Sequence, residues 1–231
     1  ILKKKIKETG YFDFETPYGY GGPITNCPDD KNFLNLSIQK FKELALKEKI
    51  IAGILRFSPY ISKNCIYNIR SIEKIYSCKT VILNIINEKN YENIFKSYNK
   101  DIKIRIKKNK NSYVFSNEIE AIQRFYKIYY KRMSEHNADE SYFFEKEYFD
   151  QIGLLKKDFW KIIEIYDDKN VIGGAIILQN KKHCNIHLSS SLKEFFKLSP
   201  NIIIRDAIIR YCLDNAIQIL HFGGGRTNQL N

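Results

Sequence analysis

Two glycine-rich segments near opposite ends of this 231-residue sequence contain the residues best suited to holding a ligand. The first, at 16–23, reads Thr-Pro-Tyr-Gly-Tyr-Gly-Gly-Pro, and the second, at 221–225, reads His-Phe-Gly-Gly-Gly. Glycine permits close approach of a backbone to a ligand, and proline stiffens a turn. The first segment is therefore either a ligand-binding loop or a turn whose tyrosines pack on the core.

Histidine and arginine side chains near predicted strand ends are further candidates. His221 ends the last predicted strand, where its ring and the N–H groups of the following glycines would open onto a cleft. Arg56 ends an earlier strand and either reaches a groove or lies on the surface. His187 shares a strand face with Ser189 and is either a site residue or a hydrogen-bonded sheet histidine. His183 lies four residues earlier, about 13 Å along a strand, so the two histidines cannot share a metal ion.

The most basic stretch is 100–110, where isoleucines alternate with cationic residues. Lys103, Arg105, Lys107 and Lys108 could clamp a pyrophosphate, because cationic N–H donors suit phosphate oxygens. The alternative is a solvated basic face. As a strand, the stretch would place three cations on one face, and as a helix it would distribute them around the axis. Both interpretations remain open at this point.

Composition indicates a folded protein with a strongly basic balance. The sequence is 44% hydrophobic with a net charge of +12, which favours polyanionic partners such as nucleic acid, anionic lipid headgroups or phosphorylated ligands. High lysine, isoleucine and asparagine usage could equally reflect an AT-rich genome. No apolar run approaches the ~18 residues of a membrane span, and no signal-peptide pattern opens the sequence. Five widely spaced cysteines without a Cys-x-x-Cys pair favour a reducing, cytoplasmic location.

Alternating strand and helix patterns predict the elements that position these residues. A strand–loop–helix–strand sequence occurs over 11–57 and again over 183–222, which indicates a weak internal duplication. Asn117 and Glu120 predict a capping box, and Ser199 is followed by Pro200 at the first position of a helix. The predicted strands are 1–7, 11–15, 50–57, 80–85, 161–166, 171–178, 183–189 and 217–222, and the predicted helices are 29–45, 90–98, 117–133, 142–149 and 199–216.

Four segments in order resemble motifs of the FemAB-like branch of the GNAT acyltransferase superfamily, which includes the peptidyltransferases that build peptidoglycan cross-bridges. The segment 14–23 is similar to that branch's Thr/Ser-Pro-Tyr-Gly-Tyr-Gly-Gly-Pro motif. The other matches are 106–110, the tyrosine-rich run 129–133 with 142–144, and the pair 187–189 and 221–225. Together they span nearly the whole sequence.

The resemblance implies an α/β (α+β) fold of two GNAT-like halves that share a central groove. Each half is expected to contain a mixed, mainly antiparallel twisted sheet flanked by helices. The first half is expected at 1–99, without its opening elements, and the second at 100–231. The resemblance implies that family members extend further at both ends, so the sequence is either a fragment or a chain with natural ends.

The resemblance also implies acyl or aminoacyl transfer to an amine of a phosphate-linked cell-envelope precursor, either a peptidoglycan lipid intermediate or a surface-glycan sugar. The reaction needs a donor carbonyl held against a neutral amine and hydrogen-bond donors facing the developing oxyanion. The predicted catalytic residues are Tyr18, Tyr130 and His221. The predicted substrate-binding residues are Tyr20, Gly21, Gly22, Arg56, Lys107, Lys108, Arg132, His187, Ser189, Gly223, Gly224 and Gly225.

One departure from the family pattern leaves the acyl donor open between acyl-CoA and aminoacyl-tRNA. GNAT enzymes that use acyl-CoA usually carry a Gln/Arg-x-x-Gly-x-Gly/Ala turn after the fourth strand, whereas 192–200 contains no glycine. Lys107 also stands where the family favours arginine, and lysine lacks the bidentate fork. The alternative function is a non-catalytic binding module for RNA or an anionic envelope precursor. Peripheral membrane contact is compatible with either function.

Overall fold

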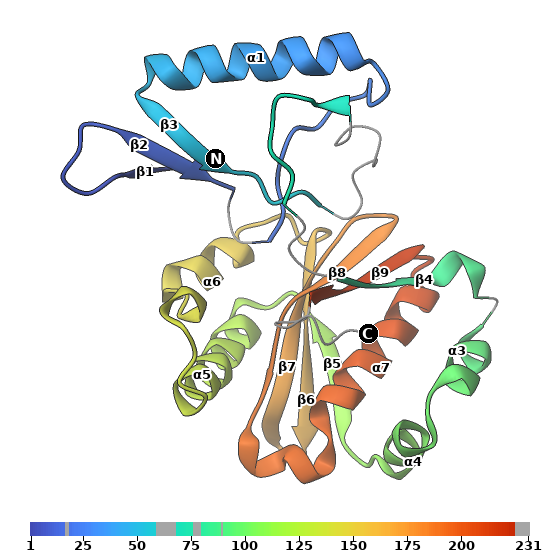
Figure 1. Cartoon of the computed structure of the whole chain (residues 1–231). Helices are drawn as coiled ribbons and strands as arrows, with labels where there is room; N and C mark the ends of the chain where they lie inside the picture. The colour runs from blue at the N-terminus through green and yellow to red at the C-terminus, as the bar shows by residue number, and fades with distance from the viewer. Residues whose placement is uncertain (17–18, 59–67, 76–79, 89, 225–231) are drawn as a thin grey trace. The chain divides into compact units, whose positions relative to one another are not determined.

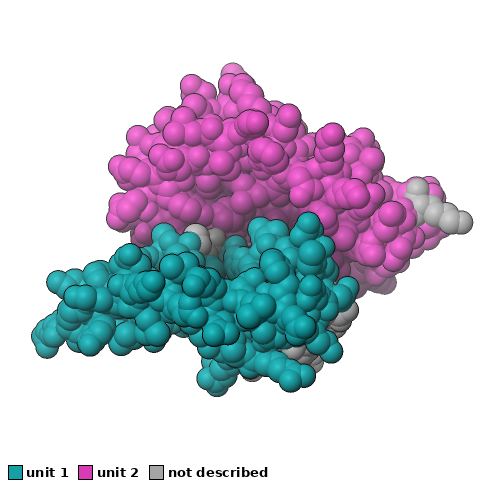
Figure 2. Space-filling model, turned by 90° about the horizontal axis from the view of Figure 1, so that it is seen from above, with its two compact units in different colours: residues 1–77 teal, residues 78–231 magenta. Residues whose placement is uncertain are grey.

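The computed structural model describes residues 1–16, 19–58, 68–75, 80–88 and 90–224. Contacts divide the chain into two compact units, Ile1–Ser77 and Cys78–Asn231, which are teal and magenta in Figure 2. Each unit has its own sheet and its own buried core. Within the described residues, none of the helices has the length and apolar character needed to cross a bilayer.

The first unit is a three-stranded sheet with one helix, in the strand order β1-β2-β3. Its elements are β1 (Leu2–Lys5), β2 (Phe12–Glu15), α1 (Lys31–Lys47) and β3 (Ile50–Ile54) (Figure 1). β1 and β2 are antiparallel, whereas β2 and β3 are parallel and α1 connects them. The carboxylate of Asp30 caps α1 by accepting a 2.9 Å hydrogen bond from the Phe33 N–H. The predicted strand pair and helix are confirmed.

The strand predicted at 50–57 is shorter and less buried than its apolar sequence suggests. β3 ends at Ile54, and only Ile50 is buried, while Ile51 and Ile54 are 55% and 62% exposed. The physical reason is its position, because β3 is an edge strand that pairs only with β2 in the part of the chain that is described. An apolar run of strand length does not distinguish an edge strand from a central one.

The second unit is built on a six-stranded sheet in the order β4-β9-β8-β7-β6-β5. Only the β8–β9 pair is parallel, so the prediction of a mixed, mainly antiparallel sheet is confirmed. The strands are β4 (Thr80–Asn84), β5 (Ser112–Ser116), β6 (Trp160–Asp167), β7 (Asn170–Gln179), β8 (His183–Ser191) and β9 (Ile219–Gly224). The helices are η1 (Ile85–Asn87), α3 (Tyr91–Ser97), α4 (Lys100–Lys108), α5 (Ile119–Glu135), η2 (Glu140–Tyr142), α6 (Lys146–Gly153), η3 (Lys193–Leu198) and α7 (Pro200–Asp214).

Helices cover both faces of this sheet, with α5 and α6 on one face and α7 on the other (Figure 1). Successive side chains of β6 point to opposite faces of the sheet and pack in different cores. Ile162 packs in the α5–α6 cluster, and Ile163 packs in the α7 cluster. Trp160, which is fully buried, anchors the α5–α6 side. The sheet therefore holds the helix ends at fixed positions along its strands.

The segment 78–99 belongs with the second unit, although the sequence places the boundary between halves at 99/100. β4 pairs with β9, and the hydroxyl groups of Tyr91 and Tyr98 donate hydrogen bonds to Asp206 Oδ1 of α7 at 2.6 and 3.3 Å. Asp206 Oδ2 also accepts a bond from Arg210 Nε at 2.9 Å. These contacts attach α3 to α7.

Three local expectations are changed by the structure. The stretch 100–108 is the helix α4, which settles the open choice between strand and helix. The capping box predicted at Asn117 is wrong, because α5 begins at Ile119 and the Asn117 amide instead donates to the Lys157 carbonyl at 2.9 Å. Ser199 is the residue before α7 with Pro200 at its first position, but its hydroxyl accepts a bond from Arg105 instead of capping the helix.

Candidate functional site

The two central strands of the second unit separate along their length. β8 and β9 pair over only three positions, from His183 with Ile219 to Asn185 with His221. Beyond these positions β8 stays paired with β7 as far as Ser191, while β9 stays paired with β4. The end of β8 therefore lacks a β9 partner among the described residues, and ligand groups can approach it.

A β-bulge marks the point where β8 leaves β9. Opposite β7, Ile186 and Leu188 face the adjacent residues Ile177 and Ile176, so His187 is an extra residue in β8. The bulge shifts the side-chain alternation, since Ile186 lies in the α7 core and Leu188 in the α5–α6 core. Bulges re-aim the side chains that follow them and are frequent beside active sites. The three serines at 189–191 follow this bulge.

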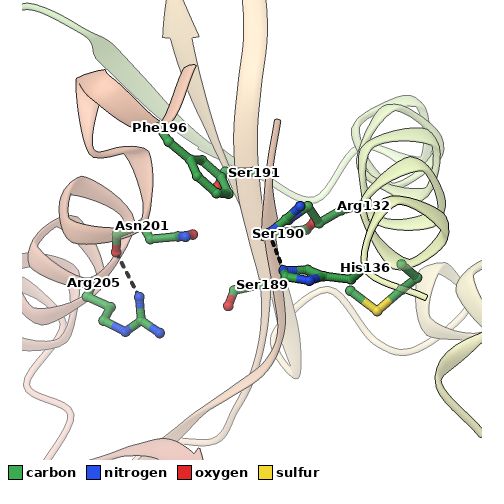
Figure 3. A pocket seen from close by; sticks show the side chains of 9 residues that line it. Arg132, His136, Ser189, Ser190, Ser191, Phe196, Asn201 and Arg205 are labelled. Atoms are coloured by element: carbon green, nitrogen blue, oxygen red, sulfur yellow. Dashed lines mark hydrogen bonds between the residues drawn. The ribbon is translucent and has the colours of Figure 1, made fainter. Parts of the chain in front are cut away.

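A pocket of about 270 Å³ lies at this end of β8 (Figure 3). It is bounded by the C-terminal part of α5, the last residues of β8, η3, and the first turns of α7. Its size suits one charged group of a ligand, since whole small-molecule sites are commonly ~300–1,000 Å³. The lining residues are Arg132, Met133, His136, Ser189, Ser190, Ser191, Phe196, Asn201 and Arg205.

The two arginines of the pocket differ in how they are held. The Arg132 side chain is 13% exposed, and its Nη1 lies 3.4 Å from Glu135 Oε2. Its Nη2 contacts His136 Nε2, and its guanidinium carbon lies 4.8 Å from the centre of the Phe196 ring. Arg205 donates to the Asn201 carbonyl at 3.1 Å, and no carboxylate of the described residues lies within ion-pair distance. Arg205 therefore brings an uncompensated positive charge to the pocket.

The serine hydroxyls supply the second feature of the pocket. Ser190 and Ser191 are 4% and 2% exposed, and neither Oγ has a hydrogen-bond partner among the described residues. A buried hydroxyl without a partner is costly, so most such groups are satisfied in native proteins. Asn201 lies in the first turn of α7, where the helix dipole is positive. Orphaned hydroxyls, a helix N-terminus and cationic side chains together suit an anionic oxygen group.

A tyrosine–histidine pair lies at the bulge. The Tyr148 hydroxyl contacts His187 Nε2, and the two ring centres are 6.0 Å apart. Burial lowers the pKa of His187 to about 4, so the imidazole is neutral at pH 7. Tyr148 stacks on Phe144 with ring centres 4.6 Å apart, which fixes the phenol. Sequence reasoning proposed His187 but missed Tyr148, whose only signal is the aromatic run preceding and opening α6.

Among the other residues predicted for this site, Arg132 and Ser189 line the pocket and His221 does not. The His221 side chain is fully buried, with Nδ1 at 2.7 Å from Asn185 Oδ1, to which it donates in the tautomer that is protonated at Nδ1. Burial lowers the pKa of its imidazole. This contact joins β8 and β9, and at the end of β9 Gly223 adopts φ 93° and Gly224 ends the strand. Gly225 lies outside the described residues.

Three further predicted residues lie away from the lining of the pocket. Tyr130 of α5 is 46% exposed and packs edge-on against Phe143 with ring centres 5.4 Å apart. Lys107 and Lys108 are exposed on α4, and the Lys107 ammonium lies 5.9 Å from the centre of the Phe95 ring. Of the predicted residues, the pocket thus brings together Arg132 and Ser189, with Asn201 and Arg205 as additions that the sequence did not indicate. His187 lies two residues before Ser189 on β8 and outside the lining of the pocket.

The glycine-rich loop of the first unit runs beside the end of β3. The Gly21 N–H donates to the Arg56 carbonyl at 2.7 Å, and the Arg56 N–H donates to the buried Thr16 Oγ1 at 3.1 Å. A Cβ on Gly21 would lie 2.6 Å from Thr16 Cγ2, so packing demands glycine. Gly22 has φ 106° and Tyr20 is 39% exposed. Arg56 Nη2 lies 3.7 Å from Glu15 Oε2. Tyr18 lies outside the described residues.

Comparisons with known proteins identify the fold. Residues 96–228 match the family described as acetyltransferase (GNAT) domain. The crystal structure of FemX has a TM-score of 0.71 at 14% identity, covering 99% of this chain and 76% of that one. A DUF2156 domain from Agrobacterium fabrum has a TM-score of 0.58 at 13% identity, and the match covers 93% of this chain and 64% of that one. A conserved protein of unknown function from Bacteroides thetaiotaomicron has a TM-score of 0.57 at 11% identity, and the match covers 94% of this chain and 71% of that one. A search of curated proteins finds no match.

Proposed function

The chain belongs to the acetyltransferase (GNAT) domain family, and from this premise we propose that it transfers an acyl or aminoacyl group to an amine of a phosphate-linked cell-envelope precursor. The motif resemblance to peptidyltransferases that build peptidoglycan cross-bridges supports the choice of precursor. The fold shared with FemX is consistent with this choice. Acyl transfer itself follows from the family.

The observation that carries the proposal is the anion-suited pocket at the end of β8. Arg205 offers a cation without an acidic partner among the described residues, and Ser190 and Ser191 offer two buried hydroxyls that lack partners there. A phosphate or carboxylate would accept hydrogen bonds from Arg205 and from the serine hydroxyl that lies on the same face of β8, because neighbouring side chains of a strand point to opposite faces. Ligand binding at this point would place the adjoining atoms along β8, toward the bulge at His187.

Transfer forms a C–N bond and breaks the bond between the acyl carbon and its carrier oxygen or sulfur. The attacking amine must be neutral, and it loses a proton while the carrier atom gains one. We assign the Tyr148–His187 pair to the positioning of this proton exchange, because the neutral His187 imidazole contacts the Tyr148 hydroxyl through Nε2. Backbone N–H groups released at the bulge are suited to the developing oxyanion.

The donor is proposed as either acyl-CoA or aminoacyl-tRNA. The glycine-free segment after β8 forms η3, and Ser199 then takes φ 57° before α7 begins. Glycines at this place would let the backbone wrap a pyrophosphate closely. Their absence favours aminoacyl-tRNA, which also fits the net charge of +12.

Ligand-induced thermal stabilisation tests the proposal directly. We expect a nucleotide-linked amino sugar to raise the melting temperature of the chain, and we expect Arg205→Gln to reduce that ligand's affinity at least tenfold, since a charged hydrogen bond contributes about 1.5–3 kcal/mol. Lys169→Gln, at the exposed β6–β7 turn, is the matched control and should leave affinity unchanged. Stabilisation by bulk RNA alone, lost at high salt, would instead support the binding-module alternative.

A further inference from the structure

Positive charge in the second unit is concentrated in one short segment. Residues 90–110, which form α3 and α4, contain seven lysines and arginines against two acids. The following residues, 111–231, contain sixteen cations against fifteen acids. The segment therefore carries a net +5, whereas the 121 residues that follow it carry +1. A composition bias spread evenly over the residues from 90 onward would not produce this contrast.

One face of α4 presents this charge to solvent. Lys100, Ile104, Lys107 and Lys108 share that face by the helical period, and all four side chains are exposed. We call these four residues the α4 face. Ile104 is 41% exposed at its centre, while Ile106 on the opposite side packs against the α7 core. The α4 face is thus an apolar side chain surrounded by three ammonium groups.

Neighbouring charges do not neutralise the α4 face. Asp101, the acid of α4, binds Arg105 Nε through Oδ2 at 2.7 Å. Arg105 Nη1 also donates to Ser199 Oγ at 2.7 Å, which ties α4 to the beginning of α7. The single arginine of the segment is therefore engaged in holding the helix, and the three lysines of the face have no ion pair with another described residue.

The chemistry of the segment favours a lipid surface over RNA. RNA-binding surfaces combine cations with accessible aromatic rings on which bases stack. The aromatic residues of α3 pack on one another, with Phe95 between Tyr91 and Tyr98, and both phenols bond to Asp206. The α4 face itself contains no aromatic residue and exposes lysine and isoleucine, the combination with which basic helices bind anionic bilayers.

We propose that the α4 face docks the protein on a bilayer surface rich in anionic phospholipid. The ammonium groups of Lys100, Lys107 and Lys108 bind lipid phosphates, and Ile104 enters the headgroup region. None of these four side chains lines the pocket, so docking and acyl transfer are separable properties of the molecule.

Vesicle sedimentation with the full chain tests the proposal. The chain should bind vesicles of phosphatidylcholine containing about 30% phosphatidylglycerol, and it should bind pure phosphatidylcholine weakly. Replacing Lys100, Lys107 and Lys108 together by glutamate should lower the partition coefficient at least ~100-fold, because each basic residue near an anionic surface contributes about fivefold. Ile104→Ser should lower it a few-fold, and this loss should persist at salt concentrations that screen charge.

The matched control reverses three exposed lysines elsewhere in the second unit, Lys156, Lys169 and Lys181, and so gives the same net charge. Binding by this control should remain within a few-fold of the parent. Equal loss in both triple variants would overturn the proposal, since it would show a delocalised charge effect. A triple α4 variant that loses bulk RNA binding but keeps vesicle binding would also overturn it and assign the face to RNA.

Discussion

The molecule contains two strand–helix–strand connections that differ in what they do. The first crossover is β2–α1–β3, the second is β8–η3–α7–β9, and in both the joined strands are parallel neighbours. In the first, β2 pairs with β3 along its whole length. In the second, the strands separate after three paired positions, and a bulge and a pocket lie where they part. The site therefore comes from strand separation and not from the connection itself.

Burial separates the two crossovers as clearly as pairing does. The helix α7 lies across the sheet with most of its length buried, whereas α1 buries only Leu34 and Ile38. A buried helix is held rigidly by close packing, and a rigid helix can present its first turn to a ligand with constant geometry. This explains why the pocket is found at the beginning of α7.

The largest expected effect is on stability. Ile208→Ala in α7, where Ile208 is fully buried, should lower the free energy of unfolding of the second unit by about 2–5 kcal/mol. Leu44→Ala in α1, where Leu44 is 53% exposed, should cost less than about 1 kcal/mol. Urea unfolding of each variant measures both values. Equal costs would contradict the contrast in burial between the two helices.

The next effect is a pH dependence in the second crossover, which contains three of the four histidines of the chain, His183, His187 and His221. Burial lowers the pKa of His187 to about 4, from an ordinary value of about 6.5. Between these values the unfolded chain binds the proton more readily, so stability falls as the pH drops from about 6.5 to about 4. This group accounts for up to ~3 kcal/mol of that loss.

His187→Gln should flatten the stability profile in this pH window by the contribution of one group. Unfolding midpoints measured at intervals across the window give the comparison. Tyr148→Phe removes the phenol that contacts His187 Nε2, and it should change the profile while leaving the core packing of its ring in place. An identical profile in His187→Gln would show that the histidine is already accessible to protons in the folded protein.

A smaller effect concerns the attachment of α3 to α7. Asp206→Asn weakens the bonds to Tyr91, Tyr98 and Arg210, and it should cost about 1–3 kcal/mol. Amide hydrogen exchange should accelerate in α3 more than in β6, which lies deeper in the sheet. Unchanged exchange in α3 would mean that the Asp206 bonds do not hold α3, and that apolar packing such as that of Ile94 suffices.

Much of the architecture follows from local patterns in the sequence. The apolar repeats of α1 and the three-strand run at 160–191 were predicted with nearly correct bounds, because periods of 3.6 and 2 are strong signals there. The segment 100–110 stayed open because its isoleucines alternate like a strand. Asn99 could have decided it, since its side chain caps α4 by accepting from the Ile102 N–H at 2.9 Å.

The pocket was only partly predictable, for a reason that lies in the geometry. Ser190 and Ser191 continue a strand pattern and carry no separate signal, and Arg205 reads as one cation on a helix. These residues line one pocket because the bulge at His187 shifts the alternation of side chains along β8. The sequence contained no pattern from which we predicted that bulge. The sequence therefore indicated the strand and the helix, but not the residues that their ends bring together.

The most direct test of the account is a crystal structure of the chain with a nucleotide-linked amino sugar. We predict an anionic group of the ligand in the pocket at the end of β8, with oxygens within hydrogen-bond distance of the Arg205 guanidinium and of one of the two serine hydroxyls, Ser190 Oγ or Ser191 Oγ. A ligand bound elsewhere, with the two serine hydroxyls satisfied by water, would contradict it.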